Sequence, residues 1–221
     1  MAGFQIQQIY KLKVVIVGPI SVGKTSLAVR FAKNTYEDIY NQTIGASFIS
    51  RSMDVGNRTF MFQLWDTAGQ ERYHCLVPMY LRDSHIALVL YDITDMTSFG
   101  LVTLYLDLLQ KNAPERVVIV LVGNKEDRAS DRVVTTKMGR DFAQTNKLLF
   151  METSAKTGQN VDDVFILASK NLPNEISSRR HFTKVGTLFF RRKFDECHPL
   201  MRREGVVPRD ASRDSDLHKL L

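Results

Sequence analysis

The sequence has few of the residues that hold small secreted or metal-bound proteins together. Its 221 residues include only two cysteines, Cys75 and Cys197, and no Cys-x-x-Cys pair or Cys/His cluster. A disulfide framework and a zinc site of the usual spacing are therefore excluded, and we expect a reducing compartment. No apolar run approaches the about 18 residues of a membrane-spanning helix, and residues 1–4 match neither a signal peptide nor an N-myristoylation site. We expect a cytoplasmic protein, or one peripheral to a membrane.

The composition otherwise permits an ordinary folded domain. Hydrophobic residues make up 44% and charged residues 24% of the chain, so wholesale disorder is excluded. The composition breaks after Pro173, which predicts a domain over 1–173 and a flexible basic tail over 174–221. The tail holds eleven Lys or Arg against seven Asp or Glu, a net +4 of the total +6. A nucleic-acid-binding protein is a weak alternative, because the predicted domain has no basic stripe.

Short apolar runs alternate with segments of helical period, which is the pattern of βαβ units. The expected strands are 11–17, 46–55, 58–65, 85–91, 117–122 and 148–152. The expected helices are 23–33, 98–111, 135–145 and 161–172, the last with Asn160 as its cap. Gly56-Asn57 is a two-residue hairpin signal, so the second and third strands should be antiparallel. We predict an α/β fold with a six-stranded, mostly parallel sheet, one antiparallel strand and helices on both faces.

Residues 18–25 follow the first expected strand and read Gly-Pro-Ile-Ser-Val-Gly-Lys-Thr, which matches G-x-x-x-x-G-K-[ST]. The glycines let consecutive backbone N–H groups turn inward around phosphate, and the following helix adds its positive end. Lys24 then reaches the β- and γ-phosphates, and the Thr25 hydroxyl is a Mg²⁺ ligand. The motif predicts that the protein binds a nucleoside di- or triphosphate.

Two polar segments at the ends of later strands identify guanine as the base. Asp127 can accept the hydrogens of guanine's ring N–H and exocyclic amine, a pair that adenine lacks. Asn124 can bond the base and tie its loop to the phosphate loop, while the stem of Lys125 covers the base plane. After the last strand, residues 153–156 (Thr-Ser-Ala-Lys) can offer a backbone N–H to the guanine carbonyl. Parallel α/β sheets bind ligands at these carboxyl ends of the strands.

The third strand leads into a segment suited to phosphate chemistry. Asp66 stands where a Walker-B carboxylate holds Mg²⁺. The Gly69 N–H can reach a γ-phosphate, and Gln70 is placed to orient the attacking water.

With these nucleotide-binding motifs in family order, residues 10–172 resemble the Ras-like small GTPases, P-loop proteins with a small G domain, and within them the Rab family. The Rab resemblance rests on residues 44–48, 70–74 and 79–82, and 73–80 looks most like the early-endosome branch. The resemblance implies that Thr43 ligates Mg²⁺ and senses the γ-phosphate, that Tyr36 packs against guanine and that Tyr40 is the switch-one tyrosine. It also implies that Phe48, Trp65 and Tyr80 form an aromatic triad beneath effectors; core packing is the alternative for the triad, and a solvent-exposed loop aromatic is the alternative for Tyr36.

The resulting site assignments are as follows. The catalytic residues are Gln70, Lys24 and Thr43, and the Mg²⁺ ligands are Thr25, Thr43 and Asp66. The nucleotide-binding residues are Gly18, Ser21, Val22, Gly23, Lys24, Thr25, Tyr36, Tyr40, Thr43, Gly69, Asn124, Lys125, Asp127, Ser154, Ala155 and Lys156. The implied partners are GTP and GDP, a GTPase-activating protein, an exchange factor and effectors that bind the switch regions of a monomer.

The sequence departs from the family pattern at two places. Ile20 stands where the family usually has a small residue, so a GTP-binding interaction module with little hydrolysis is an alternative function. The chain ends His-Lys-Leu-Leu rather than in prenylated cysteines. Residues 188–194 interleave aromatic and basic side chains that could rest on an anionic endosomal membrane, whereas a solvated tail is the alternative.

Overall fold

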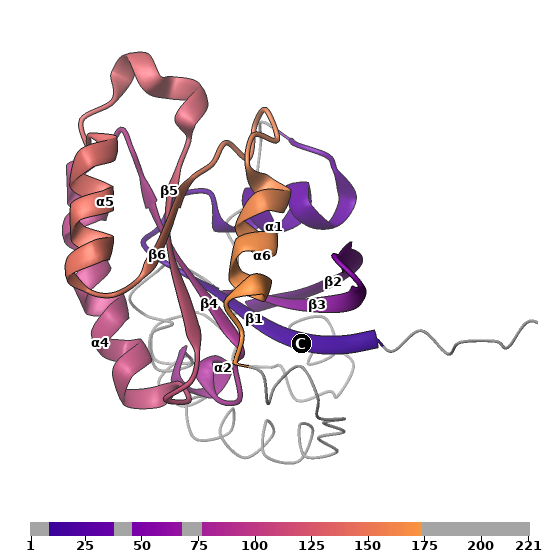
Figure 1. Cartoon of the computed structure of the whole chain (residues 1–221). Helices are drawn as coiled ribbons and strands as arrows, with labels where there is room; N and C mark the ends of the chain where they lie inside the picture. The colour runs from indigo at the N-terminus through magenta and orange to yellow at the C-terminus, as the bar shows by residue number, and fades with distance from the viewer. Residues whose placement is uncertain (1–8, 38–45, 68–76, 174–221) are drawn as a thin grey trace, which may run out of the picture.

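The described part of the chain builds one sheet around which the helices pack. The structure is a computed structural model, and it describes residues 9–37, 46–67 and 77–173. The sheet has six strands in the order β2-β3-β1-β4-β5-β6 (Figure 1). The strands are β1 (Ile9–Val17), β2 (Ala46–Val55), β3 (Arg58–Thr67), β4 (Ile86–Asp92), β5 (Val118–Asn124) and β6 (Leu149–Glu152). The predicted α/β fold class and strand set are confirmed.

The strand directions also follow the sequence pattern. β2 and β3 are antiparallel, with Val55 opposite Arg58 across the Gly56-Asn57 turn. All other neighbouring pairs are parallel. The central strand β4 is buried along its whole length, as a strand covered on both faces requires. The carboxyl ends of β1, β4, β5 and β6 therefore lie along one edge of the sheet.

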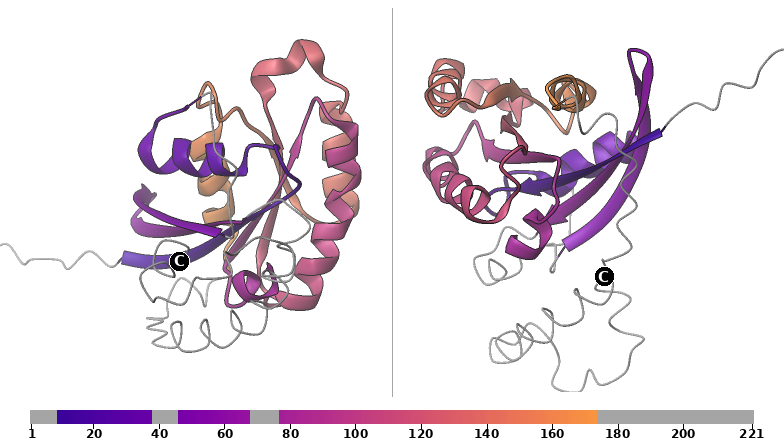
Figure 2. Two further views of the ribbon diagram at one scale, coloured as in Figure 1. Left: turned by 180° about the vertical axis from the view of Figure 1, so that it is seen from behind. Right: turned by 60° about the horizontal axis from the view of Figure 1, so that its bottom comes forward.

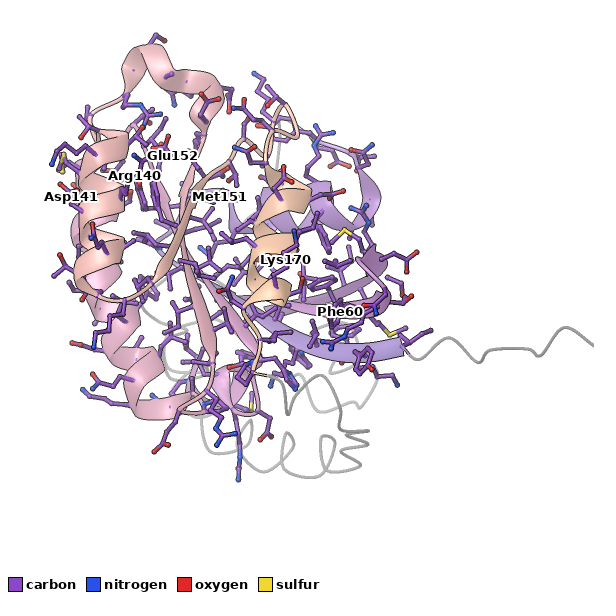
Figure 3. All side chains as sticks on the ribbon, in the orientation of Figure 1. Phe60, Arg140, Asp141, Met151, Glu152 and Lys170 are labelled. Atoms are coloured by element: carbon purple, nitrogen blue, oxygen red, sulfur yellow. The ribbon has the colours of Figure 1, made fainter. Side chains whose placement is uncertain are left out.

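Helices cover both faces of the sheet (Figure 2). The helices are α1 (Lys24–Lys33), α2 (Val77–Leu81), α3 (Met96–Gly100), α4 (Val102–Asn112), α5 (Thr136–Thr145) and α6 (Val161–Lys170), with a 3₁₀ segment at Glu126–Asp131. One apolar cluster packs α1 and α6 against the sheet, and a second packs α2, α4 and α5 against the other face. Side chains fill the space between these layers (Figure 3). Among the described helices, none combines the length and apolar character needed to cross a bilayer.

One local prediction was wrong in detail, and another, Asn160 as the N-cap of α6, was right in position but not in its side-chain bond. The helix expected over 98–111 is divided into α3 and α4 at Leu101, next to Gly100, a weak helix former. The Leu104 N–H donates to the Leu101 carbonyl, a tighter turn than an α-helix makes. Asn160 precedes α6 in a left-handed conformation, but its side chain donates to the Glu152 carbonyl rather than capping the helix.

Candidate functional site: a nucleotide site at the carboxyl ends of the strands

The loop between β1 and α1 depends on glycine at both of its ends. Gly18 has φ 146°, and a Cβ there would lie 2.4 Å from the Leu90 carbonyl oxygen. Gly23 has φ 91°, and a Cβ there would lie 2.4 Å from Asn124 Nδ2. These are close approaches that only glycine permits, so the backbone can curl tightly before α1 begins at Lys24. The arrangement is the strand, loop and helix that a phosphate-binding loop needs.

Lys24 is a buried cation at the start of α1. Its side chain donates to the Pro19 carbonyl at 2.6 Å, and the residue is 6% exposed. Burial lowers the pKa of Lys24 to about 8, against the opposing effect of the Asp66 carboxylate. A bound phosphate would supply the anionic partner that favours the charged ammonium.

Thr25 and Asp66 bring two oxygen ligands together. The Thr25 hydroxyl donates to Asp66 Oδ2 at 2.6 Å, and Ser47 donates to the same oxygen at 3.4 Å. Asp66 is fully buried, and its Oδ1 has no hydrogen-bond partner among the described residues. Burial raises the pKa of Asp66 to about 6, although the Thr25 hydrogen bond, Lys24 and Ser47 oppose it.

An orphaned carboxylate oxygen next to a hydroxyl suits a hard divalent cation. Mg²⁺ prefers one or two protein oxygen ligands completed by water and phosphate oxygens. Thr25 and Asp66 fit that donor set, so the residues present fit the implied ion. Thr43, the third predicted Mg²⁺ ligand, lies outside the described residues.

Asn124 joins three segments that are distant in the sequence. Its side-chain Nδ2 donates to the Val22 carbonyl at 2.9 Å, which ties β5 to the phosphate loop. Its Oδ1 accepts from the Thr153 hydroxyl at 3.1 Å and from the Ala155 N–H at 3.2 Å. The expected base-binding loops and the phosphate loop are therefore one connected structure.

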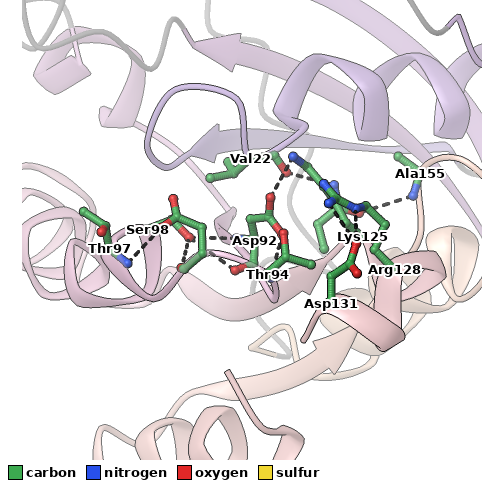
Figure 4. Close-up of polar contacts among 11 residues, drawn as sticks. Val22, Asp92, Thr94, Thr97, Ser98, Lys125, Arg128, Asp131 and Ala155 are labelled. Carbon is green, nitrogen blue, oxygen red and sulfur yellow. Dashed lines mark hydrogen bonds and ion pairs between the residues drawn. The ribbon is translucent and has the colours of Figure 1, made fainter. Parts of the chain in front are cut away.

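Asp127 and Lys125, which follow Asn124 in the chain, also have side-chain partners. Asp127 accepts a hydrogen bond from the Ser154 hydroxyl at 2.5 Å. Lys125, with φ 70°, pairs with Asp92 at 2.7 Å (Figure 4). Burial opposes ionisation of Asp92, but hydrogen bonds from Lys125 and Thr94 outweigh it and keep the pKa of Asp92 below its usual value.

Other predicted site residues divide into two groups. Ser21, in the phosphate loop, has φ 64°, and Lys156 is an exposed residue of the loop after β6. Tyr36 is partly buried, with its ring 5.9 Å from the Arg30 guanidinium carbon. The residues Tyr40, Thr43, Gly69 and Gln70 lie outside the described part of the chain.

The three predicted effector-binding aromatics form one cluster. The rings of Phe48 and Trp65 are 5.3 Å apart, and those of Trp65 and Tyr80 are 5.7 Å apart. Phe48 is 47% exposed while Tyr80 is 5% exposed. The cluster therefore reaches from the core to the surface, and its exposed end could contact a partner.

Sequence reasoning missed two residues of this site. Asp92 ends β4 and holds Lys125; an acidic residue directly after a buried apolar strand could have signalled it. Arg30 donates to the Ala155 carbonyl from α1. No local pattern could have indicated the role of Arg30 here, because its bonds to the loop after β6 end on backbone carbonyls about 125 residues away.

The fold and site together define a nucleotide-binding protein of the P-loop class. Comparison with known sequences narrows this further. Residues 13–174 match the family model described as Ras family. The chain is 43% identical over 172 residues to "Ras-related protein Rab-5A" of Dictyostelium discoideum, an alignment covering 78% of this chain and 86% of that protein. The chain belongs to the Ras family and is a small GTPase of the Rab type, which confirms the resemblance and the GTP phosphohydrolase activity predicted from the sequence.

Proposed function

We propose that this GTPase is a molecular switch in endosomal membrane traffic that binds GTP and GDP with Mg²⁺ and hydrolyses GTP slowly. The observation that carries the proposal is the Asn124 side chain, which joins the phosphate loop to both base loops. That connection supports a single site for one guanine nucleotide.

The proposed chemistry depends on positioning rather than on a covalent intermediate. Backbone N–H groups of the phosphate loop and the Lys24 ammonium face the phosphates, and Gln70 orients the attacking water. Thr25, Thr43 and Asp66 would hold Mg²⁺, which neutralises charge on the phosphate oxygens when bound. The sequence offers no arginine that is expected to act on its own γ-phosphate. We expect turnover of about 10⁻⁴ to 10⁻³ per second without an activating partner.

The base assignment can be tested with Asp127→Asn. An amide can donate to the C2 carbonyl of xanthine but cannot accept both hydrogens of guanine, so the preference should move from GTP toward XTP by about 100-fold or more. Competition binding of the two nucleotides measures this shift. Asp131→Asn is the matched control, because Asp131 lies in the same 3₁₀ segment and its side chain is 55% exposed. Adenine nucleotide in the purified protein, or an unchanged preference in Asp127→Asn, would contradict the proposal.

A GTP-binding interaction module with little hydrolysis is the second candidate, and Ile20 favours it. Ile20 is 47% exposed in the phosphate loop, beside the expected position of Gln70 and of an arginine from an activating partner. A β-branched side chain there has few rotamers with which to move aside. Ile20→Gly should then accelerate partner-stimulated GTP hydrolysis. Equal stimulated rates for the two proteins would eliminate this candidate.

We further propose that the switch segments bind an exchange factor, an activating protein and effectors, the last through Phe48, Trp65 and Tyr80. The exposure of Phe48 at the end of this aromatic cluster supports effector contact.

The basic and aromatic segment 188–194 is proposed to make a peripheral contact with anionic lipid. We propose that the protein acts as a monomer.

A further inference from the structure

Within residues 9–37, 46–67 and 77–173, Arg30 of α1 is bonded to the loop after β6 rather than to a carboxylate. Its Nε donates to the Ala155 carbonyl at 2.8 Å, and its Nη2 donates to the Lys156 carbonyl at 2.6 Å. Its Nη1 donates to the Asn34 carbonyl at 3.0 Å. One planar guanidinium therefore fixes two successive peptide groups of the loop after β6 and the end of its own helix.

Peptide geometry gives these bonds a consequence for the nucleotide site. The Ala155 carbonyl and the Lys156 N–H belong to one trans peptide, in which the two groups point in opposite directions. Holding the carbonyl toward Arg30 therefore holds the N–H away from it. The Ala155 N–H is fixed separately, by the Asn124 side chain. The Lys156 N–H is thus oriented through Arg30 of α1, and the Ala155 N–H is held by Asn124 of β5.

The Arg30 guanidinium also contacts Asn34 and Tyr36, which follow α1. Asn34 closes α1 in a left-handed conformation with its N–H bonded to the Arg30 carbonyl. The Tyr36 ring lies 5.9 Å from the guanidinium carbon, within the range of a cation–π contact. Arg30 thereby joins α1, the base loop and the chain leading toward the switch segment.

We propose that Arg30 is a positioning residue of the guanine subsite, which it serves by orienting the peptide between Ala155 and Lys156 so that the Lys156 N–H is presented to the base. The Ala155 N–H is held by Asn124 and the Thr157 N–H by Ser154. The inference rests on the guanine site proposed above. Arg30 touches no nucleotide itself in this role. It acts through the backbone, so it should slow nucleotide release without taking part in hydrolysis.

A second arginine provides a matched control. Arg51 of β2 also donates to a carbonyl of α1, that of Phe31, at 2.7 Å. It stacks on the Phe31 ring at 4.8 Å and pairs with Asp162 of α6 at 2.6 Å. These contacts join the same helix to the rest of the fold without engaging the loop at 155–157. A general loss of stability should therefore affect Arg51 variants at least as much as Arg30 variants.

The experiment measures release of a fluorescent GDP and a fluorescent GTP from the full chain in Mg²⁺. Arg30→Met should release both nucleotides about tenfold faster, which corresponds to ~1.4 kcal/mol of lost binding. Arg51→Met should change release less than twofold. Single-turnover hydrolysis of bound GTP should change less than nucleotide release in Arg30→Met, because Arg30 bonds the loop after β6 rather than the phosphate loop. Arg30→Lys should behave like Arg30→Met, because one ammonium cannot reproduce the planar fork that bonds two successive carbonyls.

The outcomes separate the inference from the proposed function. Equal acceleration in Arg30→Met and Arg51→Met, in step with their melting temperatures, would overturn the inference, as would full rescue by lysine. An unchanged rate of nucleotide release from Arg30→Met would also overturn the role proposed for Arg30. In that case, a shift in preference from GTP to XTP in Asp127→Asn would still support the guanine site. If Asp127→Asn shows no shift toward XTP, the guanine site itself is contradicted.

Discussion

Gly23 in the phosphate loop meets both a backbone requirement and a packing requirement. Gly23 ends the loop, starts α1 and leaves room for Asn124, whose Nδ2 would lie 2.4 Å from any added Cβ. The motif in the sequence predicts a glycine here for backbone reasons. Its second role, as space for a residue about 100 positions away, became visible only in the folded chain. The sequence motifs therefore predicted the phosphate loop and its tie to Asn124, but not that Gly23 is the residue that leaves room for that side chain.

Gly23→Ala should weaken nucleotide binding strongly. The methyl group must displace the Asn124 amide, which breaks the bond to Val22 and loosens both base loops. We expect GDP affinity to fall by about 100-fold, equivalent to ~2.7 kcal/mol, as titration calorimetry can measure.

The control is Gly56→Ala in the β2–β3 turn. Gly56 also has a positive φ, 63°, but a Cβ there meets nothing within 4 Å. The substitution should cost about 1 to 2 kcal/mol of folding stability through backbone strain alone and leave GDP affinity unchanged. Similar GDP affinities in the two variants would contradict the proposed role of the Asn124 contact.

Whole elements were predicted more reliably than their ends. The strands and the crossover helices follow from apolar periodicity, because alternation and helical spacing reflect which face is buried. The division of 98–111 at Leu101 and the side chain of Asn160 depend on hydrogen bonds with neighbours outside each element. Periodicity carries no information about such bonds. The short α2 and the 3₁₀ segment at 126–131 are also too brief to produce a clear period.

Packing between α1 and α6 is the main prediction at the scale of elements. The Phe165 ring stacks on Phe31 at 3.6 Å and meets the edge of Phe62 at 5.5 Å. Phe165 is fully buried, so Phe165→Ala should lower the free energy of unfolding by about 3 to 5 kcal/mol. Urea unfolding at saturating GDP measures this loss.

A substitution at the neighbouring, less buried Ile166 serves as the control. Ile166→Ala should lower the unfolding free energy clearly less, because its side chain leaves a smaller cavity. Equal losses at both positions would show that the aromatic stack does not hold α6 in place.

At the scale of the whole molecule, the predicted boundary at Pro173 is open to direct test. α6 ends at Lys170, and Leu172, just before Pro173, already packs against the apolar cluster that joins α6 to the sheet. A chain ending at Pro173 should therefore keep its melting temperature within about 4 °C, a change of less than ~1 kcal/mol, and retain its bound nucleotide. Loss of the fold on truncation would show that 174–221 is part of the domain.

The same pair of proteins tests the tail's proposed contact with lipid. The full chain should sediment with vesicles of anionic lipid, and the chain ending at Pro173 should not. Binding should weaken as salt is added, because the attraction is electrostatic. Equal sedimentation of both proteins would place the lipid contact elsewhere.

The sequence by itself determined the fold class, the phosphate loop and the family, because each depends on residue types at short, regular spacings. The tertiary structure decided which distant groups meet. It set the Thr25 hydroxyl beside the buried Asp66, the Asn124 amide against Val22, and Arg30 against the loop at 155–157. The tie from Asn124 to the phosphate loop was expected from its motif, and the structure showed which carbonyl it reaches. Arg30 bonds backbone carbonyls, which every residue carries, so no residue pattern could have indicated its contacts.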